Sequence, residues 1–129
     1  MRKFLVVLVC VSAFFVMGCA APCVDKSTQE AKIVNASMER AHQAVVNAFS
    51  VLGFNIMKDE ADYVQGVKPR KMGFVVGSGG ERVGVWLEKI SDTETKIIAS
   101  TAKTYVGMVG QKRWDEQVLL EIENDLKGN

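Results

Sequence analysis

The sequence predicts an α+β fold, a two-layer sandwich in which two helices cover one face of an antiparallel sheet. Three observations predict it: an apolar stripe with helical spacing in residues 37–52, a pair of β-rich runs at 82–90 and 95–103, and a second helical stripe at 114–127. Short turns join most of the extended segments, so neighbouring strands run antiparallel and the sheet holds about four to six of them. Both helices can then pack on the same face.

The first helix has the clearest pattern in the chain. Its apolar residues recur with a period of 3.6, which is typical of an amphipathic helix. Ser37 is a favoured N-cap and Gly53 a favoured helix stop. The stripe consists of Met38, Ala41, Val45, Ala48, Phe49 and Leu52.

The strands are predicted from alternation and turn chemistry. Residues 54–58 and 63–68 flank an acidic turn, with Gly66 as a candidate bulge, and 72–76 is a further short candidate. The runs 82–90 and 95–103 form a hairpin around Ser-Asp-Thr-Glu, the strongest pairing in the sequence. On its first arm Val83, Val85 and Leu87 share one face, and Gly84, Trp86 and Glu88 share the other.

At the two ends of the domain the sequence predicts a segment that could be strand or helix and a final helix. Residues 27–36 fit a strand at 31–35, and they equally fit a helix that begins with the capping box at 27–30. In the last helix Trp114, Val118, Leu119, Ile122 and Leu126 keep helical spacing. We expect Asp115 to be its N-cap and Gly128 to end it.

The N-terminus has the parts of a secretory signal peptide. Arg2 and Lys3 precede a mainly apolar run, Phe4 to Met17, of 14 residues. That run is shorter than the roughly 20 residues that a spanning helix needs. It ends in Val16-Met17-Gly18-Cys19, which resembles the lipobox of bacterial lipoproteins, with Val16 where the pattern prefers Leu. The alternative is an ordinary signal peptide, or an uncleaved anchor, with an incidental cysteine.

The lipobox resemblance implies cleavage before Cys19 and acylation of its sulfur. The expected organisation is then a signal peptide at 1–18, a lipidated Cys19 with a tether at 19–29, and one α+β domain at 30–129. In diderm lipoproteins an Asp after the cysteine resembles a signal for retention in the inner membrane. Ala20 stands there, so we expect an anchor in the outer membrane, on its periplasmic face.

The order of elements in the domain carries a second, broader resemblance. The helix, Gly53-Phe54, the hairpin and the Gly-punctuated stretch before Trp114 are similar to small, uncharacterised bacterial envelope lipoproteins. More distantly, they are similar to the helix-grip domains of a lipoprotein in the outer-membrane protein assembly machinery. The resemblance covers about residues 31–127 and brings no catalytic motif.

Charge and cysteine usage exclude several classes of function. The chain has 16 Lys and Arg against 15 Asp and Glu, and loss of Arg2 and Lys3 with the signal leaves 14 against 15. A nearly neutral domain argues against nucleic-acid binding, which needs an excess of cations. After lipidation of Cys19 the odd thiol is Cys23, which is either inert or forms an intermolecular disulfide. A single histidine, His42, cannot build a zinc site, and we expect no cofactor or metal.

Two clusters are candidate binding sites. Lys68, Arg70 and Lys71 could contact an anionic surface such as lipid head groups, or could simply be solvated. Trp86, Ile90 and Ile98 could form an apolar patch for a partner on the uncovered sheet face, unless Trp86 faces the helices.

The sequence contains no recognisable set of catalytic residues, and the expected function follows from this. Residues 77–82 lack the ending of a phosphate loop, and Asp59, Glu60 and Asp62 have the composition of a turn. We expect a non-enzymatic module that binds another envelope component. The alternative is a carrier with a pocket for a small apolar ligand between sheet and helices. Nothing in the sequence specifies an oligomeric state.

Replacing Cys19 by Ser tests the lipid anchor. The Cys19→Ser precursor should lose palmitate labelling and lipoprotein-type cleavage, because both reactions need the cysteine sulfur. Metabolic labelling followed by gel analysis measures this, with Cys23→Ser as the matched control that should still be labelled. Unchanged processing of the Cys19→Ser precursor would indicate an ordinary signal peptide.

Overall fold

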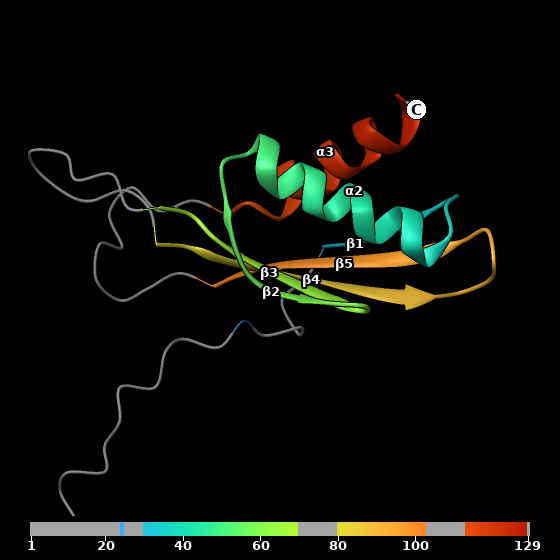
Figure 1. The fold of residues 1–129 in the computed structure, drawn as a ribbon, viewed down its shortest axis with the longest axis horizontal. Helices are drawn as coiled ribbons and strands as arrows, with labels where there is room; N and C mark the ends of the chain where they lie inside the picture. Colours follow the sequence, from blue (N-terminus) through green and yellow to red (C-terminus); the bar gives the residue numbers. More distant parts are fainter. Residues whose placement is uncertain (1–23, 25–29, 70–79, 103–112, 129) are drawn as a thin grey trace, which may run out of the picture.

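The computed structural model describes residues 24, 30–69, 80–102 and 113–128. These residues form a five-stranded sheet with two helices on one of its faces (Figure 1). In chain order the elements are β1 (Glu30–Val34), α2 (Met38–Val51), β2 (Asn55–Glu60), β3 (Tyr63–Val67), β4 (Arg82–Lys89), β5 (Thr95–Ala102) and α3 (Asp115–Lys127). The predicted α+β two-layer sandwich is confirmed.

The sheet has the strand order β1-β5-β4-β3-β2, and every neighbouring pair is antiparallel. The predicted hairpin is the β4–β5 pair, in which Trp86 lies opposite Ile98. The ambiguity at 27–36 is resolved for residues 30–34, which form a strand paired with β5. The candidate strand at 72–76 lies outside the described residues.

Helix α2 connects the two edges of the sheet, because β1 forms one edge and β2 the other. Ser37 caps its N-terminus: the Ser37 Oγ accepts a hydrogen bond from the Arg40 N–H at 3.3 Å. After its C-terminus Gly53 adopts a φ of +73°, which a residue with a side chain rarely does. The reversal brings the Phe54 N–H within 2.8 Å of the Phe49 carbonyl oxygen. The predicted cap and stop are both confirmed.

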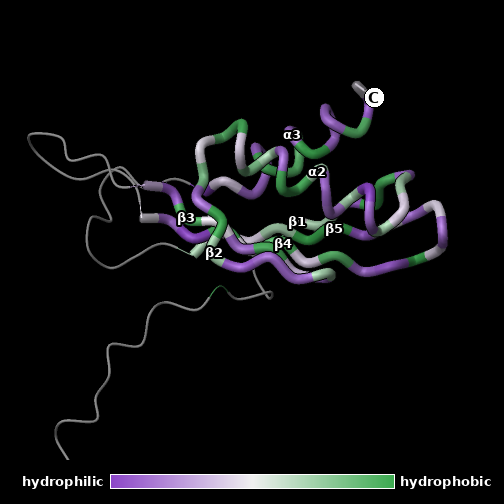
Figure 2. Tube along the Cα trace, viewed as in Figure 1, coloured by the Kyte–Doolittle hydropathy of each residue, from purple (hydrophilic) through white to green (hydrophobic). Residues whose placement is uncertain are grey.

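The hydrophobic core lies between the helices and one face of the sheet, which we call the inner face. On β4 this face carries Val83, Val85 and Leu87, which share one face as predicted and are all buried. Both helices alternate between hydrophobic and hydrophilic residues along their turns (Figure 2), so each buries one side. From the helices the core receives Ala41, Ala44, Val45, Ala48, Phe49, Val118, Leu119 and Ile122.

Two local predictions were wrong. The irregularity in the β2–β3 pair falls between Ile56 and Lys58 of β2, so the extra residue is Met57 and not Gly66. Gly66 instead leaves room for the core: a Cβ there would lie 3.1 Å from the Phe54 Cβ and 3.3 Å from the Phe49 ring. At α3 the N-cap is Trp114, whose side chain makes no capping hydrogen bond.

Phe49→Ala should destabilise the domain by about 3–5 kcal/mol, the usual cost of removing a large aromatic side chain from a core. Phe49 is fully buried, packs at 5.3 Å from Phe54 and lies against the bare backbone of Gly66. Urea unfolding followed by circular dichroism measures the loss. Val51→Ala is the control, since Val51 is 69% exposed on the same helix and should change stability by less than about 0.5 kcal/mol. Equal effects of the two substitutions would contradict this packing.

Candidate interaction surface

The second face of the sheet, which we call the outer face, points away from both helices (Figure 1). Successive residues of a strand point to opposite faces, and Val85 and Leu87 are buried in the inner core. Trp86 therefore lies on the outer face, together with Gly84 and Glu88. Of the two alternatives that the sequence left open for Trp86, the structure supports the outer position.

On this face Trp86 stacks on Tyr63 of β3, which lies directly opposite it. Their ring centroids are 5.0 Å apart and the ring planes are inclined by 39°. The Tyr63 hydroxyl donates a hydrogen bond to the Gln65 Oε1 at 3.0 Å, which fixes the tyrosine along its own strand. We call Tyr63 and Trp86 the aromatic pair.

Gly84 makes the close packing of the aromatic pair feasible. A Cβ at Gly84 would lie 2.8 Å from the Tyr63 Oη and 3.1 Å from the Trp86 Cη2. Both rings therefore reach over the bare backbone of Gly84. Aromatic rings held in this way offer a large contact area with little conformational freedom left to lose.

The structure places two of the three residues of the predicted apolar patch, Trp86 and Ile98, side by side, and the third, Ile90, farther along the strand. Ile98 lies opposite Trp86 on β5 and is only 2% exposed. Ile90 follows the end of β4, four residues beyond Trp86 and so about 13 Å along the strand direction, and is 49% exposed. Tyr63, which the sequence did not single out, is the aromatic neighbour of Trp86.

Of the predicted basic cluster, Lys68 lies among the described residues. The Lys68 ammonium donates to the Leu52 carbonyl oxygen at the end of α2. It lies 5.0 Å from the centroid of the Phe54 ring and 4.6 Å from that of the Trp114 ring. Those two rings meet edge to face at 5.3 Å. Lys68 thus joins the end of α2 to the start of α3, whereas Arg70 and Lys71 lie outside the described residues and their contact with an anionic surface stays a prediction.

Asp115 is a buried carboxylate at the start of α3, with an exposed fraction of 2%. Its Oδ2 accepts hydrogen bonds from the Arg113 Nε at 3.1 Å and Nη2 at 2.6 Å, and its Oδ1 accepts from the Thr101 hydroxyl. The Thr101 Oγ1 in turn accepts the Trp114 N–H at 2.9 Å. This network attaches the helix to β5, so it has a structural explanation.

The remaining ion pairs of the described residues lie at the surface. Hydrogen bonds from Lys32 and then Lys127 hold the pKa of the Glu123 carboxyl below its ordinary value. His42 Nε2 lies 2.7 Å from Asp59 Oδ1, between α2 and β2. Water screens such pairs, so each contributes little to stability. Among the described residues no group of three or more His, Cys, Asp and Glu side chains could hold a metal ion.

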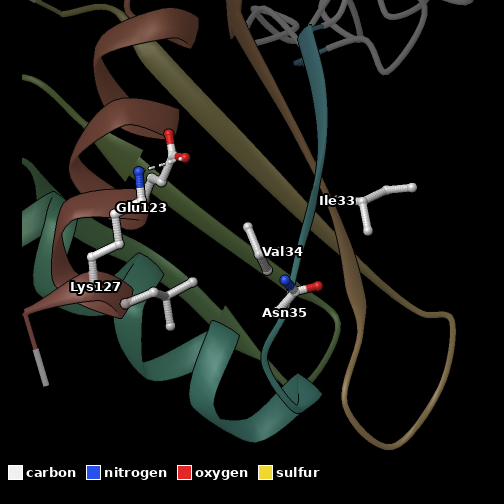
Figure 3. Close-up of a pocket in the computed structure, with 6 residues that line it drawn as sticks. Ile33, Val34, Asn35, Glu123 and Lys127 are labelled. Atoms are coloured by element: carbon white, nitrogen blue, oxygen red, sulfur yellow. Dashed lines mark ion pairs between the residues drawn. The ribbon is translucent and has the colours of Figure 1, made fainter.

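Hollows in the described residues lie on the surface. One of about 240 Å³ lies between β1 and the end of α3 and is lined by Val34, Leu126 and the Glu123–Lys127 ion pair, while Ile33 points away from that pair (Figure 3). Between sheet and helices the described side chains are packed together, and Phe49, Val85 and Ile122 are fully buried.

No family model matches this chain, and no curated protein matches its sequence. In the parts of the chain that the structure describes, no helix is long and apolar enough to cross a membrane.

Lys68→Met should destabilise the domain by about 2 kcal/mol, since it removes a charge-assisted hydrogen bond and two cation–π contacts while keeping most of the side-chain volume. The midpoint of urea unfolding measures the effect. Lys58→Met on the exposed strand β2 is the matched control and should change stability by less than about 0.5 kcal/mol. If the two variants unfold at the same urea concentration, Lys68 does not join the helices as described.

Proposed function

We propose that this protein is a lipid-anchored component of the bacterial cell envelope whose domain binds another envelope protein without catalysing a reaction. The observation that carries the proposal is the aromatic pair on the sheet face that the helices leave uncovered. Tyrosine and tryptophan are enriched among the residues that dominate binding energy at protein interfaces. The helices use the inner face for folding, so the outer face is the one that remains for a partner.

Charge around the aromatic pair favours a protein partner over a polyanion. Lys58, Arg82 and Lys96 share the outer face with Glu60 and Glu88, as the strand registers place them. Lys96 and Glu88 already form an ion pair at 3.5 Å. A surface with both signs interspersed gives a phosphate-rich ligand no concentrated positive field, whereas it suits the polar rim of a protein interface.

The N-terminal pattern supplies the location. β1 begins at Glu30, eleven residues after Cys19, so an extended tether would reach at most about 37 Å. Two or three acyl chains on the cysteine would anchor the protein stably. We therefore place the domain close to the periplasmic surface of the outer membrane, where a membrane-bound or periplasmic protein could meet the aromatic pair.

Photo-cross-linking in the native envelope tests this function. With benzoylphenylalanine in place of Trp86 we expect a discrete protein adduct, and Tyr63→Ser in the same chain should weaken it by about tenfold because the ring is no longer held in place. The control carries the same probe at Leu120, which is 57% exposed on α3 and so lies outside the outer face. Identical adducts at both positions, or cross-links to bulk lipid alone, would refute the proposal.

A further inference from the structure

The two edges of the sheet differ in how well they are protected. β2 forms one edge and β1 the other. Natural sheets protect their edges with bulges and charged side chains, which prevent pairing with further strands. β2 has both, a bulge at Met57 and the charged run 58–60. β1 pairs with β5 in unbroken register over its whole length and contains neither a bulge nor a proline.

The outward edge of β1 offers backbone groups to an incoming strand. A strand in an antiparallel ladder directs half of its N–H and C=O groups to one neighbour and half to the opposite side. In the described part of the chain, β5 is the one strand that pairs with β1. Ala31, Lys32 and Ile33 are exposed, and an ion pair with Glu123 of α3 holds the Lys32 ammonium on the helix side. A row of such backbone groups is matched by an extended chain.

Helix α3 runs beside this edge, and two hollows lie between the helix and the strand. The larger, of about 440 Å³, includes Ala31 and Leu119 in its lining. The smaller, of about 240 Å³, includes Val34 and Leu126. Ile33 and Val34 point to opposite sides of β1 (Figure 3). A strand added to β1 would direct every second side chain toward α3 in the same way, so the hollows can receive its side chains.

The charges beside β1 favour a different protein over a second copy of this chain. Lys32 and Lys127 both pair with Glu123, so two ammonium groups share one carboxylate. Glu116 lies at the other end of α3, in its first turn. The register that pairs the whole of β1 with β1 of a second copy would place Lys32 opposite Lys32 of that copy. Like charges directly opposite each other destabilise a sheet, whereas a carboxylate opposite Lys32 would be attracted.

We propose that the outward edge of β1 binds an extended segment of a partner protein, which adds a strand antiparallel to β1, as every other pair in this sheet is. An apolar side chain opposite Val34 would enter the hollow at Leu126. The next residue, also apolar, would lie against Ile33 on the outer face, and an acidic residue would follow opposite Lys32. β5 and β4 separate this edge from the aromatic pair, so the inference goes beyond the proposed function.

Hydrogen exchange measured by NMR tests the added strand in the mature, full-length chain carrying Cys19→Ser. The probe is the peptide acetyl-Ser-Thr-Val-Ile-Asp-Thr-Ser-amide, which has the apolar, apolar, acidic order. Half of the β1 amides bond to β5 and already exchange slowly. The peptide should slow the exchange of the other β1 amides by at least about tenfold and leave those of β2 unchanged.

Two versions of the peptide, N-methylated on alternate residues, separate backbone pairing from side-chain contact. An added strand bonds to β1 through one of its own edges, so one version should bind and the other should not. Equal binding of the two versions would overturn the inference.

The charge of the groove is tested with a peptide that has Lys in place of Asp. It should bind at least about fivefold more weakly than the acidic peptide. Lys127→Glu should abolish this preference. Lys58→Glu, on the other edge of the sheet, is the matched control and should retain it.

Slow exchange of the outward β1 amides before any peptide is added would also overturn the inference, because the edge would then be covered already. A dependence on protein concentration would identify a second copy as the cover, and no such dependence would identify another segment of this chain. The function at the aromatic pair is tested separately, since the probe at position 86 lies on β4. An adduct there without peptide binding at β1 would retain that function and refute the added strand, and the converse result would do the opposite.

Discussion

The packing of α2 against the inner face of the sheet is the interaction on which the rest of the structure depends. The helix joins the two edge strands β1 and β2, so it has to cross the sheet. Ala41, Ala44 and Ala48 are buried along it, and such small residues allow close approach of the helix to the strands. Phe49 then fills the space between Phe54 and Gly66. The small alanine side chains thus allow the helix to lie close to the sheet, and the Phe49 ring fills the space that remains at its C-terminal end.

That packing distinguishes the inner face of the sheet, which α2 and α3 cover, from the outer face, which they leave uncovered. Lys68 joins the end of α2 to the start of α3 through its contacts with the Leu52 carbonyl oxygen and the Trp114 ring. On the outer face Gly84 allows Tyr63 and Trp86 to pack closely.

Most of the fold could be predicted from the sequence, because the signals for it are local. The period of α2, its Ser37 cap, its Gly53 stop and the alternation along β4 each depend on neighbouring residues. The site was predicted only in part. Tyr63 meets Trp86 through the register between β3 and β4, and ten residues outside the described structure, 70–79, separate those strands. No pattern in the sequence specifies that register.

The same limit applies at two charged residues. Lys68 adjoins Arg70 and Lys71 in sequence, but its partners in the structure come from the end of α2 and the start of α3 and could not be read from the sequence. Asp115 has the residue type of an N-cap, yet Thr101 from β5 and Arg113 determine its place. Long-range contacts outweigh local propensity at both positions.

The most direct test of the division into two faces compares Val85→Asp with Trp86→Asp, adjacent substitutions on one strand. Thermal unfolding of each variant is followed by circular dichroism. Val85 is fully buried against the helices, so an unpaired carboxylate there should abolish the cooperative transition. Trp86→Asp should retain a cooperative transition and lose about 2 kcal/mol or less, from the aromatic contact and from strand propensity. Loss of the folded state in both variants, or in Trp86→Asp alone, would contradict an outer face that is free to bind.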